Sequence, residues 1–116
     1  MSLDRASPTQ RRWIEQISGH LGRFHQKPAE IYVMFRLDEG RAAFACLRPL
    51  ANCLRLYTLL DPAEDPRLRP GTSTGSFKRW RSEYDIVQET DIPGAEDLIA
   101  HAANHPGAQK RGRSGA

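Results

Sequence analysis

Residues 30–37 read Glu-Ile-Tyr-Val-Met-Phe-Arg-Leu, and this stretch decides the fold. Apolar side chains at its odd positions alternate with tyrosine, methionine and arginine at its even positions. A period of two is typical of a β-strand that buries one face. Residues 38–41, Asp-Glu-Gly-Arg, then predict a turn, because glycine accepts positive φ at little cost. The chain is therefore expected to enter a sheet here.

Strand-like runs follow at 42–48 and 53–60, and a fourth strand is expected at about 82–89. Ser7-Pro8-Thr9-Gln10 predicts a capped start for a helix over 8–21. A last helix opens near 90–94 and stops at His105-Pro106-Gly107. We predict an α+β fold: an antiparallel four-stranded sheet with the N- and C-terminal helices packed on one face, in the order α-β-β-β-β-α.

Strand register predicts the state of the two cysteines. A two-residue turn places Phe35 opposite Phe44, and a three-residue loop then places Cys46 opposite Leu54. In this register Cys46 points into the core and Cys53 points to the other face. The pair should form no disulfide, and two free thiols fit a reducing cytosol.

Composition indicates one small domain. The chain has 116 residues, of which 39% are hydrophobic and 27% are charged. No apolar run reaches the roughly 18 residues of a membrane helix, and the N-terminus has no apolar signal region. We expect a cytoplasmic protein that does not contact the membrane, with an α+β domain at 1–106 and a disordered basic tail at 107–116.

The net charge of +3 comes from that tail. Lys110, Arg111 and Arg113 belong to it, and the rest of the chain has 14 basic and 14 acidic residues. The basic isoelectric point is therefore no argument for nucleic acid by itself. The long loop at 61–75, rich in proline and glycine, is the kind of connection that is often functional.

The sheet face turned away from the helices is expected to be open. It would show Tyr32, Met34, Arg36, Arg55, Tyr57, Glu83 and Asp85. One interpretation is a solvated face on which arginines pair with Glu83 or Asp85 across strands. A second is burial against another copy of the chain, and a third is stacking of nucleic-acid bases on tyrosine and arginine.

Residues 77–81, Phe-Lys-Arg-Trp-Arg, place three cations around two aromatic rings. This composition suits phosphate contact with stacking, and nearby threonine and serine hydroxyls could add hydrogen bonds. The alternative is structural. Trp80 would then belong to the core, and the cations would pair with Asp61, Glu64 and Asp65 across the loop.

Signs of catalysis or metal binding are weak in this sequence. His101 and His105 are four residues apart with Asp97 one turn earlier, but the zinc-protease pattern needs a glutamate where Ala102 stands. The chain has no nucleophile elbow, Walker loop or dinucleotide-binding glycines. We therefore assign no catalytic residue, no metal and no cofactor, and expect a binding domain rather than an enzyme.

The chain resembles a bacterial family of small domains of unknown function over about residues 29–103. Its members occur alone or fused to nuclease-like proteins, and some are labelled predicted transport proteins. The layout also looks like the double-wing domains of the MmcQ/YjbR type, for which DNA binding has been suggested. The stretches that support the resemblance are Ile31-Tyr32-Val33-Met34-Phe35, Phe44-Ala45-Cys46-Leu47-Arg48-Pro49, Leu54-Arg55-Leu56-Tyr57, Asp65-Pro66-Arg67-Leu68, Trp80 and Asp97-Leu98-Ile99. The resemblance implies a fold and no catalytic residues.

The leading hypothesis is a small binding or accessory domain that associates with nucleic acid. A homodimeric interaction module that uses the open sheet face is the alternative, and an enzyme acting on a small ligand is the third hypothesis. The candidate nucleic-acid-binding residues are Lys78, Arg79, Trp80, Arg81, Arg36, Arg55 and Tyr57.

Overall fold

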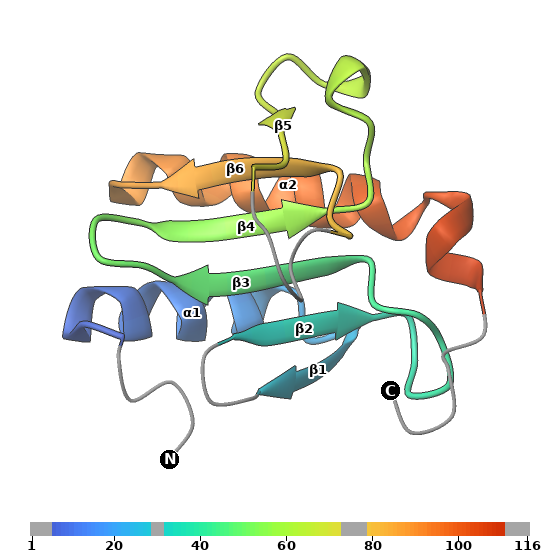
Figure 1. Ribbon diagram of the computed structural model, residues 1–116. Coiled ribbons are helices and arrows are strands. Elements are labelled where there is room, and N and C mark those ends of the chain that lie inside the picture. The colour runs from blue at the N-terminus through green and yellow to red at the C-terminus, as the bar shows by residue number, and fades with distance from the viewer. Residues whose placement is uncertain (1–5, 29–31, 73–78, 111–116) are drawn as a thin grey trace.

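A six-stranded antiparallel sheet organises the computed structural model, which describes residues 6–28, 32–72 and 79–110 (Figure 1). The order across the sheet is β1-β2-β3-β4-β6-β5. In chain order the strands are β1 (His25–Pro28), β2 (Val33–Arg36), β3 (Ala45–Pro49), β4 (Leu54–Thr58), β5 (Arg69–Pro70) and β6 (Ser82–Ile86).

Two α-helices, α1 (Pro8–His20) and α2 (Ile92–Ala103), lie together behind the sheet in Figure 1. Ile17 of α1 and Leu98 of α2 are fully buried with Phe35 and Leu56 of the sheet, so this side of the sheet holds the main core. The described residues also form short 3₁₀ helices, which are η1 (Pro62–Glu64), η3 (Glu89–Asp91) and η4 (Pro106–Gln109).

The start of α1 has the predicted capping box. The Ser7 hydroxyl accepts from the Gln10 backbone N–H at 3.1 Å, and the Gln10 side chain accepts from the Ser7 N–H at 2.9 Å. The Gln10 amide also donates to the carbonyls of Leu50 and Cys53 at 2.8 and 2.9 Å. One side chain therefore caps the helix and fixes the turn between β3 and β4 against it.

The α+β class, the antiparallel sheet and the two helices are confirmed, but the prediction of four strands is wrong. The order of elements along the chain also differs from the predicted α-β-β-β-β-α. The extra strands are the edge strands, β1 and β5. β1 has the sequence His-Gln-Lys-Pro, with no apolar alternation, and β5 has two residues inside the expected loop. Pairing with β2 and β6, rather than local pattern, makes them strands.

The predicted register is wrong in both hairpins. Val33 lies opposite Leu47 rather than Cys46, and Cys46 lies opposite Tyr57 rather than Leu54. The reason lies in β3 and the residues before it, because positions 43–47 are all buried. A strand covered on both faces shows no alternation that would indicate which side chain points inward.

Both thiols are free, as predicted, but for a different reason. Cys46 is on the face away from the helices, and Cys53 precedes Leu54 and so shares the face of Arg55 and Tyr57. Leu50, whose N–H donates to the Cys53 carbonyl, directly follows β3 and is four residues from Cys46 in extended chain. Four residues of strand span about 13 Å, beyond the reach of a disulfide.

The ordered body extends into the segment expected to be a tail. Ala108 of η4 is fully buried, and the Lys110 carbonyl accepts from the Ala42 N–H at 2.9 Å. Residues 111–116, with Arg111 and Arg113, lie outside the described residues. Neither of the two α-helices has the length and apolar character needed to cross a bilayer, within the part of the chain that the structure describes.

Candidate functional site

The face of the sheet turned away from the helices is the candidate site, and we call it the outer face. Alternation and register place one set of side chains there. The set comprises His25 and Lys27 on β1, Met34 and Arg36 on β2, Cys46 and Arg48 on β3, Arg55 and Tyr57 on β4, Arg69 on β5, and Glu83 and Asp85 on β6.

The middle of the outer face is covered, which corrects the prediction that the face is open. Trp80 lies just before β6, is 3% exposed, and packs with Ala43, Cys46 and Tyr57 in a second apolar cluster. Tyr57 is fully buried as a result. Trp80 is therefore a core residue, as the structural alternative proposed, although in the cluster on the outer face. Neither ring is available to stack a base.

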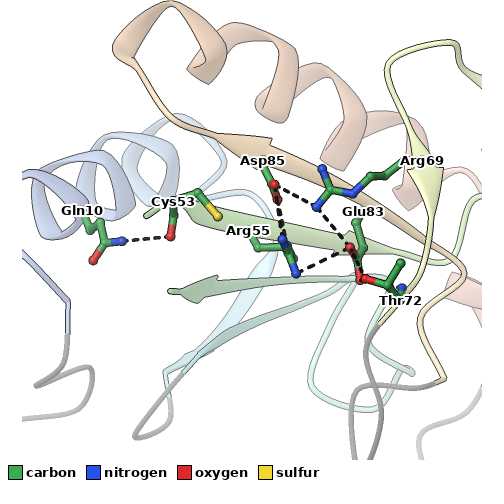
Figure 2. A network of polar contacts seen from close by, with 7 residues as sticks. All are labelled: Gln10, Cys53, Arg55, Arg69, Thr72, Glu83 and Asp85. Atoms are coloured by element: carbon green, nitrogen blue, oxygen red, sulfur yellow. Dashed lines mark hydrogen bonds and ion pairs between the residues drawn. The ribbon is translucent and has the colours of Figure 1, made fainter. Parts of the chain in front are cut away.

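The end of the outer face formed by β4, β6 and β5 is an ion-pair network (Figure 2). Asp85 accepts from Arg55 Nε at 2.8 Å and from Arg69 Nη2 at 2.8 Å. Glu83, whose side chain is fully buried, lies 3.3 Å from Arg69 Nη2 and 3.7 Å from Arg55 Nη1. Its carboxylate also accepts from the backbone N–H of Thr72 at 2.9 Å.

This network neutralises its own charges. Burial raises the pKa of Asp85, but hydrogen bonds from Arg55 and Arg69 outweigh burial and leave that pKa below its usual value. The hydrogen bond to Asp85 raises the pKa of Arg55. Cross-strand pairing of Arg55 is therefore confirmed as its structural role. A network of two guanidinium groups and two carboxylates has no surplus charge for a ligand.

The opposite end of the outer face is basic. We call Lys27, Arg36 and Arg79 the basic patch. The strands that form this end, β1, β2 and β3, contain no acidic residue. Among the described residues, no ion pair joins Lys27, Arg36 or Arg79 to a carboxylate.

Arg79 is the centre of the basic patch. Its Cζ lies 4.6 Å from the ring centroid of Trp80, a cation–π contact over the second apolar cluster. Desolvation lowers the pKa of Arg79, and the nearby charge of Arg36 lowers it further. Arg48 and Arg79 both act electrostatically on the Cys46 thiol below them, although burial dominates and raises the pKa of Cys46 to about 12. Arg36 and Arg79 are therefore close enough to act on one another electrostatically, and Arg79 lies within the same range of Cys46.

Of the seven residues that sequence analysis selected, the structure brings together Tyr57, Trp80, Arg79 and Arg36, but only Arg36 and Arg79 belong to the basic patch. Arg81 is exposed elsewhere and pairs with Asp61 at 2.9 Å, as the structural alternative proposed. Lys78 lies outside the described residues. Arg55, Tyr57 and Trp80 are held in the network and the apolar cluster described above.

Sequence analysis missed Lys27 of the basic patch, and it did not place Arg48 on the outer face. Lys27 lies in the unrecognised edge strand, and Arg48 shares the parity of Cys46, which the predicted register placed in the core. A signal for Arg48 was present, because arginine at the end of an apolar run more often marks the solvated side. Lys27 had no local signal.

His105 lies after α2, and both His105 and Asp97 have structural roles. His105 caps η4, since its Nδ1 accepts from the Gly107 N–H at 2.9 Å. Asp97 accepts from Arg67 Nη2 at 2.7 Å. No group of three metal-binding side chains occurs within residues 6–28, 32–72 and 79–110.

Comparison with known proteins found no matching family model, no matching curated protein and no matching solved structure. The resemblance to the small bacterial domain family and to MmcQ/YjbR domains therefore stays a prediction. The site has to be interpreted from its own geometry.

Proposed function

We propose that the protein is a nucleic-acid-binding domain that holds the phosphate backbone on the basic patch. The observation that supports this function is the separation of charge on the outer face. Glu83 and Asp85 are matched by Arg55 and Arg69 at one end, whereas the strands at the other end have basic residues and no acid. A concentrated positive potential of this kind attracts a polyanion.

The chemistry of the patch suits phosphate. Two of its three members are arginines, whose planar guanidinium groups form bidentate hydrogen bonds with phosphate oxygens. Arg79 and Lys27 are exposed and Arg36 is half-buried, so the cations border solvent. Lys110, Arg111 and Arg113 would add further positive charge to the protein. No specific observation on the outer face favours a catalytic function.

The test is the salt dependence of oligonucleotide binding, measured by fluorescence anisotropy with labelled single-stranded and duplex probes. Phosphate contacts release counterions, so affinity should fall steeply, by about tenfold or more, between 50 and 200 mM salt. The double variant Arg36→Glu/Arg79→Glu should lose binding at every salt concentration.

The matched control is Arg12→Glu, at an exposed position of α1. It changes the net charge of the protein by half as much as the double variant does. A second control, Arg12→Glu/Arg23→Glu, matches the full change in net charge. Both controls should bind nearly as the wild type does. The proposal fails if the wild type binds no probe at low salt, or if the second control loses as much affinity as the patch variant.

A further inference from the structure

We infer that the basic patch takes its nucleic acid as a single strand, with one base stacked on the guanidinium of Arg79. This inference rests on the proposed function and adds the form of the ligand. The observation that leads to it is the layered contact in which a buried indole supports an exposed cation.

Buried residues beneath Trp80 hold the indole of this layered contact in position. Trp80 is 3% exposed and is held by Cys46 and Tyr57, which are both fully buried. Directly after β5, the Gly71 N–H donates to the carbonyl of Arg81 at 3.0 Å, which ties the residue following Trp80 to the edge of the sheet. The indole therefore has little freedom to move, and it offers the Arg79 guanidinium a fixed surface before any ligand arrives. Such preorganisation lowers the entropic cost of binding.

The upper layer is a flat cation at the surface. Arg79 lies 4.6 Å from the Trp80 centroid and is exposed. A guanidinium plane is one of the surfaces on which an unpaired base stacks, and a neighbouring cation can hold the phosphate of the same nucleotide. Arg36 is near enough to Arg79 to act on it electrostatically.

The shape of the face favours a single strand over a duplex. The basic end spans β1 to β3, about 10 Å across, which is room for a few nucleotides. The major groove of a duplex is about 12 Å wide and admits a helix or a two-stranded ribbon, not the broad face of a six-stranded sheet. Bases in a duplex are also stacked on one another, so they offer Arg79 no free surface.

The experiment compares an oligothymidylate of twelve nucleotides with the same strand in a duplex, by anisotropy at fixed salt. The wild type should bind the single strand about tenfold or more tightly than the duplex. The variant Arg79→Lys keeps the charge and loses the planar group. It should bind the single strand about fivefold or more weakly than the wild type while the slope of log affinity against log salt stays unchanged.

Two controls isolate stacking from general effects of arginine loss. The Cζ of Arg23 lies 4.5 Å from the ring centroid of Phe24, and Phe24 packs against the main core on the helix side of the sheet. Arg23→Lys therefore makes the same change at an arginine–aromatic contact away from the patch. Arg36→Lys makes the same change at a patch residue that has no cation–π contact within the described residues. Both should bind the single strand within about twofold of the wild type, and far-UV circular dichroism should show all three variants folded.

Each outcome is decisive. Equal binding of single strand and duplex, or an Arg79→Lys variant that binds like the wild type, overturns the inference and leaves the proposed function standing. Failure of the wild type to bind either probe overturns both. An equal loss in Arg79→Lys and Arg36→Lys shows that the patch recognises phosphate alone, which also overturns the stacking role.

Discussion

Glu83 shows how one carboxylate can hold several parts of the outer face. Its side chain is fully buried between Arg55, Arg69 and Thr72, and β6 presents it beside Tyr57. An acidic residue is seldom buried this deeply unless it is paired. The carboxylate stabilises the fold because the two arginines balance its buried charge and because it accepts the backbone N–H of Thr72.

Replacing Glu83 should therefore be costly. Glu83→Ala removes the acceptor of the Thr72 N–H and half of the acidic charge beside the two arginines. We expect a loss of about 3 kcal/mol in the free energy of unfolding, measured by urea denaturation. Glu15→Ala, at an exposed position of α1, should change it by less than about 0.5 kcal/mol. Similar losses in the two variants would contradict the structural role of Glu83.

Asp65 should make the stability of the protein depend on pH. Its carboxylate accepts from Arg67 Nε at 2.9 Å and from Arg67 Nη2 at 2.7 Å, and these hydrogen bonds lower the pKa of Asp65 to about 2. An unfolded aspartate has a pKa of about 3.9. A pKa that is lower in the folded state stabilises the protein above about pH 4, and this contribution disappears as the pH falls towards about 2.

The variant Asp65→Asn isolates this effect. At pH 7 the wild type should be more stable than the variant by at most about 2 kcal/mol, and the difference should shrink steadily between pH 4 and pH 2. Urea denaturation over that range measures both proteins. A difference that stays constant from pH 7 to pH 2 would show that Asp65 contributes through something other than its charge.

At the scale of elements, the connection between β5 and β6 depends on one glycine. A Cβ added at Gly71 would lie 2.4 Å from the carbonyl oxygen of Trp80, which is a backbone atom and cannot simply rotate away. Gly71→Ala should therefore force the two segments apart and lower the free energy of unfolding by about 1–3 kcal/mol. Thermal and urea denaturation measure the change.

A second glycine provides the opposite expectation. A Cβ at Gly19, in α1, would meet no heavy atom within 4 Å among the described residues. Gly19→Ala should stabilise the protein by about 0.5–1 kcal/mol, because alanine favours the helix. The prediction for Gly71 is contradicted if Gly71→Ala leaves the free energy of unfolding unchanged or raises it, and the prediction for Gly19 is contradicted if Gly19→Ala lowers it.

Sequence pattern predicted those elements whose local signals agree with their tertiary environment. β2 alternates because one of its faces meets the helices, and α1 has a capping box that needs no tertiary contact. The pattern failed where the environment overrides it. β1 is a strand because β2 offers it a partner, and residues 43–47 show no alternation because both faces of the sheet are covered there.

The candidate site was predictable in composition but not in geometry. Arginine with Glu83 and Asp85 across strands follows from residue type and parity, and the network confirms it for Arg55. The position of Trp80 could not be inferred in the same way. It depends on how the long connection before β6 crosses the sheet, and neither propensity nor periodicity encodes that path.

At the scale of the whole molecule, the two thiols report on global unfolding. Cys46 is fully buried and Cys53 is 8% exposed, and burial raises the pKa of both. A thiol reacts as its thiolate, so the native protein should react very slowly with Ellman's reagent at pH 8, whereas both thiols should react in urea. The variant Cys53→Ser isolates Cys46, and its fast modification in the native state would contradict the burial described here.

The two borders of the sheet have a consequence for how the molecule behaves in a crowded solution. β1 ends in Pro28 and contains Lys27, and the two residues of β5 are Arg69 and Pro70. Proline has no N–H to offer an incoming strand, and like charges repel when identical borders approach one another. Strand addition between copies, the first step towards fibrils, is therefore disfavoured at both margins of the described sheet.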